Sequence, residues 1–344
     1  MKKELTALIL SAALLLSVSA CSQSFSAVLS GTSSDGISSD GTQKIYKIGV
    51  VQLMEHDALD NAYNGFVDGL KAAGYEDGKN IQIDYENAQN EQANCVTIAS
   101  KLVNEDSDLI FAIATQAAQA AANATKDIPI LVTAVTDPAD AKLVQSNDKP
   151  GTNVTGTSDL TPVKEQIQLL KEMVPDVTNV GLMYCSSESN SKFQIEIAEK
   201  ECDALGIRYT VKTVSSSNEV QQVAQSLVGR VQAVYVPTDN MLASGMKTLS
   251  MVFTPAKIPI VVGESGMVKN GGVATYGINY YKLGQQTAQM AVKILTGEAQ
   301  PADMPIEYQE DMDAAVNEDA AKQLGITIPQ DLLDKVSSAA SSGN

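Results

Sequence analysis

The 344-residue sequence contains no tryptophan, few aromatic residues, one histidine (His56) and four cysteines. It also lacks a G-x-S-x-G nucleophile turn, a P-loop and a G-x-G-x-x-G segment after the first predicted strand. A single histidine and an odd number of cysteines after position 21 do not match the ligand spacing of a zinc site. We therefore expect neither an enzyme, nor a cofactor, nor a metal centre.

Positive charge is also scarce, because 24 Lys and Arg face 41 Asp and Glu and leave a net charge of −17. Such an acidic surface repels phosphate backbones, so nucleic-acid binding is not expected. The length and a hydrophobic content of 44% suit two lobes, each with a core of its own. Cys95, Cys185 and Cys202 are expected to be buried thiols, with a Cys95–Cys202 or Cys185–Cys202 bridge as the alternative.

The N-terminus has the layout of a secretory signal peptide. Lys2 and Lys3 precede an apolar run from Leu5 to Leu16, which is too short to anchor in a bilayer as a stable span. The run ends in the segment 18–21, Val-Ser-Ala-Cys, which resembles a bacterial lipobox. That resemblance implies cleavage after residue 20 and lipidation of Cys21, with an ordinary signal peptide and an incidental cysteine as the alternative. Residues 21–43, rich in Ser and Gly, then predict a flexible tether that holds the body at the outer face of the cytoplasmic membrane.

From residue 44 onward, apolar strand-like runs alternate with segments of helical periodicity. Strands are predicted at 45–53, 81–85, 109–114, 129–135 and 153–157, and again at 180–184, 207–214, 231–236, 260–262 and 273–276. Helices are predicted at 60–73, 93–103, 116–125, 162–173, 193–205, 220–227, 246–254 and 283–295. No other segment reaches the length of a transmembrane helix. This order predicts an α/β protein with two doubly wound parallel sheets, each forming one lobe.

Ligands of such sheets bind beyond the carboxyl ends of the strands, so polar residues that follow strands are the site candidates. Each of them is alternatively a simple helix cap, as Thr161 before Pro162 would be. The candidates are Gln52, Glu55, His56, Thr115, Gln116, Ala117, Thr136, Asp137, Asp159, Asn190, Thr238, Asp239, Asn240 and Glu264.

Two kinds of charge recognition are combined in this set. Helix N-termini near Thr115, Gln116, Ala117 and Thr136 predict a site for a carboxylate. Asp159, Asp239 or Glu264 predicts a partner for an ammonium group. A zwitterion, most simply an amino acid, satisfies both, and His56 is expected to contact the ligand rather than act as a base.

Several segments together resemble the ABC transporter substrate-binding proteins of the tryptophan/tyrosine-binding type. They are Ile48–His56, Ala58–Asp60, Phe111–Gln119, Thr133–Pro138, Asn153–Asp159, Tyr235–Asn240 and Gly263–Ser265. The resemblance implies a type I periplasmic-binding fold with three crossovers, no catalysis, an aromatic amino acid as ligand, and an ABC permease with its ATPase as partners. We expect a monomer.

With this fold, the first lobe is expected at 44–158 plus 278–303, the second at 159–277 plus 304–336, and a disordered tail at 337–344. Sugar or nucleoside binding, or a sensory receptor role of the same fold, remains the alternative function.

Overall fold

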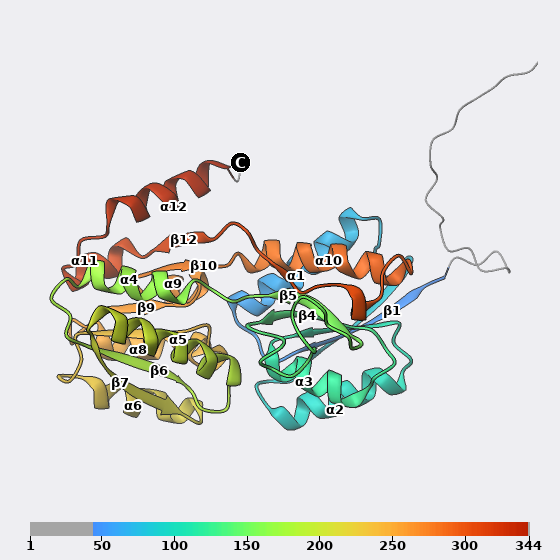
Figure 1. Ribbon diagram of the computed structural model, residues 1–344, viewed down its shortest axis with the longest axis horizontal. Coiled ribbons are helices and arrows are strands. Elements are labelled where there is room, and N and C mark those ends of the chain that lie inside the picture. Colours follow the sequence, from blue (N-terminus) through green and yellow to red (C-terminus); the bar gives the residue numbers. More distant parts are fainter. Residues whose placement is uncertain (1–43, 343–344) are drawn as a thin grey trace, which may run out of the picture. The chain divides into compact units, whose positions relative to one another are not determined.

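The computed structural model describes residues 44–342, and the predicted signal peptide, Cys21 and tether lie outside this range. Two six-stranded sheets organise the described chain (Figure 1). The predicted α/β architecture with two doubly wound lobes is confirmed. No helix within 44–342 is both long and apolar enough to cross a bilayer.

The first sheet has the order β11-β5-β4-β3-β1-β2, with every neighbouring pair parallel. Its strands are β1 (Tyr46–Gln52), β2 (Ile81–Asn87), β3 (Leu109–Ile113), β4 (Ile130–Val135), β5 (Val154–Ser158) and β11 (Glu307–Tyr308). Strands β3 and β4 are buried along their whole length, as expected for parallel strands covered on both faces.

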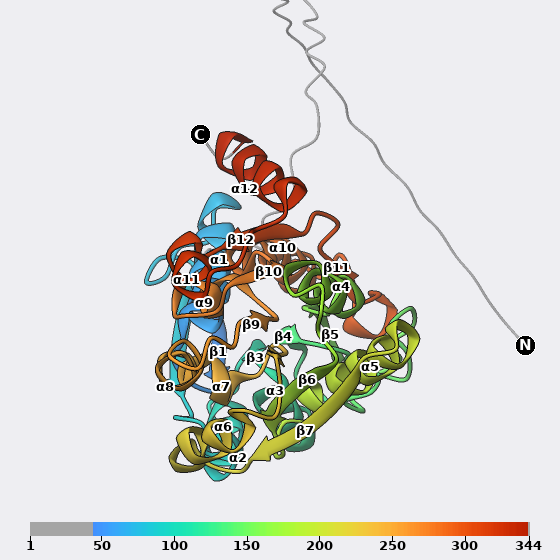
Figure 2. The same ribbon diagram turned by 90° about the vertical axis from the view of Figure 1, so that its left-hand side faces the viewer.

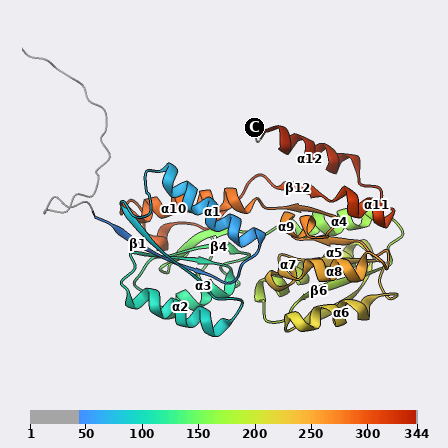
Figure 3. The ribbon, with the colours of Figure 1, turned by 180° about the vertical axis from the view of Figure 1, so that it is seen from behind.

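Four helices cover the first sheet, two on each face (Figures 1 and 3). They are α1 (Asp57–Ala72) and α10 (Tyr280–Leu295) on one face, and α2 (Gln92–Asn104) and α3 (Thr115–Ala124) on the other. Glycines allow α1 and α10 to approach closely, since a Cβ on Gly284 would lie 2.1 Å from the Ala62 carbonyl oxygen. This packing fixes the start of both helices at the same end of the sheet, where its parallel strands finish.

The second sheet has the order β12-β10-β9-β8-β6-β7. Its strands are β6 (Asn179–Cys185), β7 (Arg208–Val214), β8 (Ala233–Val236), β9 (Ile260–Val262), β10 (Ala274–Gly277) and β12 (Asp313–Val316). All pairs are parallel except β10 with β12, which is antiparallel and lies at the edge. The prediction of purely parallel sheets misses this edge strand.

Helices also cover both faces of the second sheet, and Figure 2 shows α4 and α5 on the side opposite α6 and α8. They are α4 (Val163–Met173), α5 (Ser189–Leu205), α6 (Val220–Leu227) and α8 (Met246–Phe253). Each face has its own apolar core. The shorter elements are α7 (Asn240–Ser244), α9 (Ser265–Lys269), α11 (Glu318–Leu324), and the 3-10 turns Ser217–Glu219 and Pro301–Asp303.

Three segments cross between the lobes, after β5, after β10 and after β11. The third crossover comes later than predicted, because Glu307 and Tyr308 pair with Thr157 and Ser158 of the first sheet. Met304 and Ile306 are buried in the core of the first lobe, which explains why the chain stays there beyond residue 303.

The C-terminal helix α12 (Gln330–Ser342) corrects the prediction of a disordered tail from residue 337. Leu332 is fully buried in the second lobe, and the Lys335 ammonium lies 4.4 Å from the centre of the Tyr276 ring. These contacts secure the first turns of the helix, which then continues to residue 342. Cys95, Cys185 and Cys202 are buried and unbridged, as expected.

Candidate functional site

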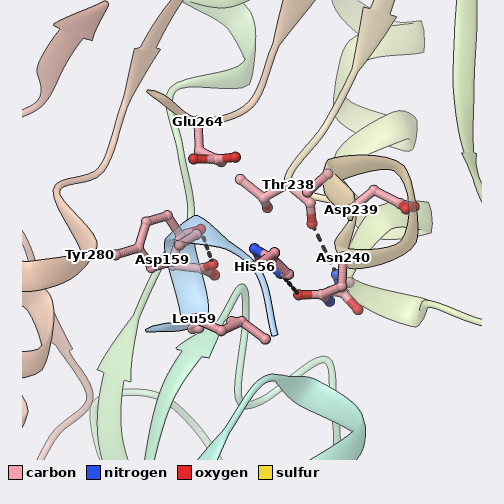
Figure 4. A pocket seen from close by; sticks show the side chains of 12 residues that line it. His56, Leu59, Asp159, Thr238, Asp239, Asn240, Glu264 and Tyr280 are labelled. Atoms are coloured by element: carbon pink, nitrogen blue, oxygen red, sulfur yellow. Dashed lines mark hydrogen bonds between the residues drawn. The ribbon is translucent and has the colours of Figure 1, made fainter. Parts of the chain in front are cut away.

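The carboxyl ends of both sheets meet at a narrow pocket with a cavity volume of about 10 Å³ (Figure 4). Side chains from both lobes and from the first crossover line it: His56, Ala58, Leu59, Ala134, Asp159, Asn190, Thr238, Asp239, Asn240, Ala243, Glu264 and Tyr280. A more open cavity adjoins it, shares His56, Ala243 and Glu264, and is also lined by Glu55, Asp57 and Lys247. The inner pocket therefore has an entrance bearing charges of both signs.

Asp159 follows β5 and has a side-chain oxygen available for a ligand. Its Oδ2 accepts a hydrogen bond of 2.6 Å from the Tyr280 hydroxyl, drawn in Figure 4, whereas its buried Oδ1 has no hydrogen-bond partner within residues 44–342. Burial raises the pKa of Asp159, and the hydroxyls of Tyr280 and Thr136 partly oppose this effect. An unpaired carboxylate oxygen in a buried pocket calls for a donor.

His56 immediately precedes α1 and reaches across to the second lobe. Its Nε2 lies 3.1 Å from Oδ1 of Asn240, which begins α7. The other ring nitrogen, Nδ1, is buried and unpaired in the described chain, and it faces the space near Asp159 and Glu264 in Figure 4. Burial lowers the pKa of His56, so the imidazole is neutral at neutral pH.

Asp239 and Glu264 are occupied as helix caps. Asp239 accepts hydrogen bonds from the Cys185 and Leu242 backbone N–H groups, and its carboxylate points away from the pocket in Figure 4. Glu264 accepts from the N–H groups of Gly266 and Met267 at the start of α9, while burial raises its pKa to about 7. Both residues line the pocket, but their carboxylate oxygens already accept backbone N–H groups.

Glu188 is a buried carboxylate behind the pocket that the sequence analysis did not single out. Its oxygens accept hydrogen bonds from the side-chain amide of Asn240 at 2.6 Å, from the backbone N–H groups of Asn240 and Met241, and from the Asn190 amide. Burial and the neighbouring Asp239 raise the pKa of Glu188 to about 8. This residue therefore holds Asn240 and Asn190 in fixed orientations.

Asn190 supplies another unpaired atom to the pocket. Its amide nitrogen donates to Glu188, to the Ser191 hydroxyl and to the Thr238 carbonyl, so its orientation is set. Its Oδ1 is buried and has no partner in the described structure. Three pocket side chains, His56, Asp159 and Asn190, thus each present a buried atom without a partner.

The structure brings half of the sequence candidates to this pocket. They are His56, Asp159, Asn190, Thr238, Asp239, Asn240 and Glu264. Glu55 lines only the outer cavity. The other candidates do not line either of these cavities: Gln52, Thr115, Gln116, Ala117, Thr136 and Asp137.

Contacts with the second lobe explain the position of the candidates on α3 and β4. The Gln116 amide donates to the Ser187 carbonyl oxygen at 3.0 Å, and the Gln194 amide donates to the Thr136 hydroxyl at 3.2 Å. The Gln116 side chain and the Thr136 hydroxyl are thus engaged with the second lobe, whereas no side chain caps the start of α3.

The remaining candidates organise turns. Gln52 donates to the Met54 carbonyl and to Asp60, and Asp137 accepts from the N–H groups of Ala139 and Asp140. The prediction that Thr161 caps α4 is wrong. No side chain caps that helix, and the Thr161 hydroxyl has no partner in the described chain.

Tyr280 is the pocket residue that the sequence analysis missed most directly. Tyr280 follows β10 and begins α10. It is therefore a strand-end position of the same kind as the other candidates. Ala58, Leu59, Ala134 and Ala243 carry no polar side chain and gave no signal. Within residues 44–342, no cluster of three or more His, Cys, Asp or Glu side chains is placed to hold a metal ion.

Comparison with known proteins identifies the family. Residues 47–340 match the family model of ABC transporter substrate binding proteins. The chain belongs to this family. Within it, the chain is 44% identical over 283 residues to the tyrosine-binding protein of Clostridioides difficile (strain R20291), covering 82% of each chain.

Two solved structures, one with ligand and one open and ligand-free, allow the arrangement of the lobes to be compared. An ABC domain from Streptococcus pneumonia in complex with L-Trp is 39% identical, with a TM-score of 0.81, and the match covers 84% of this chain and 98% of that one. The ligand-free, open structure of a substrate binding protein with adhesive properties from Clostridium difficile is 50% identical, with a TM-score of 0.65 over 83% and 96% of the chains.

The protein described here is therefore closer in shape to the ligand-bound relative, although it is closer in sequence to the open one. These relatives confirm the predicted resemblance to the tryptophan/tyrosine-binding type and the periplasmic-binding fold. ABC transporter substrate-binding proteins bind their substrate outside the cytoplasm. The family is defined by substrate binding and is not a class of enzymes.

Proposed function

We propose that this protein captures an aromatic L-amino acid in the inter-lobe pocket and delivers it to an ABC importer. The observation that carries the proposal is the set of unpaired pocket atoms: Nδ1 of His56, Oδ1 of Asp159 and Oδ1 of Asn190. A neutral imidazole nitrogen, a carboxylate oxygen and an amide oxygen are acceptors. An ammonium group, with three N–H donors, is the ligand group best matched to a pocket with surplus acceptors.

Asp159 is the proposed counter-charge for the ammonium group. Burying an ammonium ion without a negative partner costs more than its contacts return, so one carboxylate must face it. Asp239 and Glu264 use their oxygens to cap helices, which leaves Asp159 with the free oxygen. Of the three carboxylates predicted as possible partners of the ammonium group, Asp159 is therefore the one that we propose.

The ligand carboxylate is proposed to bind at the start of α1. No side chain caps this helix, and its first-turn residues Ala58 and Leu59 line the pocket. The first backbone N–H groups of a helix have no partner within it and favour an anion. This replaces the site predicted at the start of α3, where Gln116 already contacts the second lobe.

The aromatic character of the ligand rests on the relatives, one named for tyrosine and one holding L-Trp. Leu59, Ala134, Ala243 and the Tyr280 ring supply apolar surface around the polar atoms. A sugar is disfavoured because each hydroxyl both donates and accepts, whereas the unpaired pocket atoms that carry the proposal accept.

Calorimetry with tyrosine, tryptophan and the Asp159→Asn variant tests this function. The substitution keeps the shape of the side chain but removes its charge, and we expect affinity to fall by roughly 10²–10⁴. Asp203→Asn is the matched control, since Asp203 is exposed in the second lobe and should bind as wild type. Equal affinity of Asp159→Asn and wild type, or no binding of any amino acid to wild type, would refute the proposal.

The importer role is proposed to require a lipid anchor on Cys21, supported by the lipobox-like segment that ends at this residue. Cys21→Ala should move the protein from the membrane fraction to the soluble fraction, while ligand affinity is unchanged. Fractionation of cells followed by mass spectrometry of the mature N-terminus measures both. A membrane-bound Cys21→Ala variant would show that the anchor lies elsewhere.

A further inference from the structure

We propose that Glu188 is a positioning residue for ligand recognition: through Asn240 it holds His56 as the Nε2–H tautomer, so that Nδ1 accepts a hydrogen bond from the ligand's ammonium group. This inference rests on the proposed function and deepens it. Glu188 itself does not line the pocket, so its effect must pass through Asn240.

The first step is the orientation of Asn240. Its side-chain nitrogen donates to Glu188 Oε2 at 2.6 Å, and its backbone N–H donates to the same oxygen at 3.0 Å. Above the pKa of about 8 of Glu188 the group is a carboxylate that only accepts hydrogen bonds, and it already accepts from the backbone N–H groups of Asn240 and Met241, so the NH₂ end of the amide faces Glu188. The carbonyl end, Oδ1, is therefore the atom that faces His56 at 3.1 Å.

The second step is the tautomer of His56. An amide oxygen accepts and cannot donate, so the His56 nitrogen opposite it, Nε2, carries the proton. Burial keeps the ring neutral, which leaves Nδ1 with a free lone pair. That atom is buried and unpaired among the described residues, and it faces the pocket in Figure 4.

The third step links recognition to the meeting of the lobes. His56 belongs to the first lobe, whereas Glu188 and Asn240 belong to the second. The tautomer is therefore set only when the lobes are together. With the lobes together, Nδ1 has no protein partner among the described residues, and an ammonium N–H can supply one.

Nitrogen NMR tests the tautomer directly, because His56 is the only histidine in the sequence. Tag-free, nitrogen-15-labelled protein is measured by long-range proton–nitrogen correlation at about pH 8.5, above the pKa of about 8 of Glu188. We expect a protonated Nε2 and a bare Nδ1 in the closed, tyrosine-bound wild type. Tyrosine and phenylalanine should both move the Nδ1 signal, since both carry an ammonium group, whereas 3-(4-hydroxyphenyl)propanoate, which lacks it, should not.

Two variants test the role of Glu188. Glu188→Gln allows the Asn240 amide to turn over, and Asn240→Ala removes the acceptor from His56. Both should give a mixture of tautomers and weaken tyrosine binding about 10-fold, the cost of one misdirected buried hydrogen bond. Asp203→Asn is the matched control, because Asp203 is exposed in the second lobe and lies outside the pocket. Its tautomer spectrum should match wild type.

Several results would overturn the inference. A proton on Nδ1 in the bound wild type would do so, as would an unchanged tautomer and affinity in both variants. A shift caused by tyrosine but not by phenylalanine would assign the contact to the ligand side chain instead. If the wild type binds no amino acid, the proposed function fails as well. If the wild type binds normally and the tautomer is unchanged in Glu188→Gln and Asn240→Ala, this inference alone fails.

Discussion

Three buried carboxylates at the ligand site have different tasks, and their hydrogen bonds decide which. Asp239 and Glu264 each accept two backbone N–H groups at the start of a short helix. Asp159 accepts from the Tyr280 hydroxyl through Oδ2, and its Oδ1 has no hydrogen-bond partner among residues 44–342. The residue type alone therefore does not identify the ammonium partner, whereas the supply of nearby N–H groups does.

Two buried carboxylates, Glu188 and Glu264, predict how stability depends on pH. The pKa of Glu188 is raised from 4.5 to about 8, and that of Glu264 from 4.5 to about 7. At pH values between 4.5 and the raised pKa of each group, the folded chain binds more protons than the unfolded chain. Stability therefore falls as pH rises from 4.5 to the raised pKa values. We expect the free energy of unfolding of ligand-free protein to fall steadily between about pH 5 and pH 8.5.

Urea unfolding across this pH range measures the slope, and Glu188→Gln is the informative variant. It removes one titrating group, so its stability should change less with pH than that of wild type. The net charge of −17 acts in the same direction in both proteins and cancels in the comparison. Stability that rises with pH in the wild type, or an unaltered slope in the variant, would contradict the assignment.

At the scale of elements, long periodic segments were predictable and short ones were not. The helix predicted at 283–295 and the buried strand predicted at 109–114 correspond to α10 (Tyr280–Leu295) and β3 (Leu109–Ile113). The five-residue helices α7 and α9 complete barely more than one turn, so they show no periodic pattern. Yet these two helices set the caps at Asp239 and Glu264, and α7 presents Asn240 to His56.

The site was predictable to the extent that it depends on strand ends. Asp159 directly follows β5, His56 lies in the turn between β1 and α1, and parallel sheets bring such positions together. Glu188 follows a strand too, but its importance depends on contacts with Asn240, 52 residues away along the chain. The carboxylate site at the start of α3 stays a prediction, and only the packing of the lobes shows that the Gln116 side chain faces Ser187.

At the scale of the whole described molecule, the lobes meet at the mouth of the cleft through contacts that an open form would lose. Asp57 of α1 and Lys269 of α9 form an ion pair at 3.3 Å, and His56 bonds to Asn240 beside it. Gly266 allows this approach, because a Cβ there would lie 2.9 Å from the Cβ of Asp57. Exposed ion pairs contribute little, so the close packing at Gly266 is the stricter requirement.

A methyl group at this point should hinder closure. The hinge motion of two lobes around a solute predicts that a saturating amino acid lowers the radius of gyration of wild type in small-angle scattering. In Gly266→Ala the added Cβ presses on α1, so we expect a smaller decrease and an affinity reduced about 10-fold, within the usual cost of overpacking. Ser265→Ala is the matched control, because Ser265 is exposed on the same turn and loses atoms rather than gaining them. If Gly266→Ala closes and binds as wild type does, contact between α1 and α9 does not limit closure, and the recognition of ligand must depend on the pocket side chains alone.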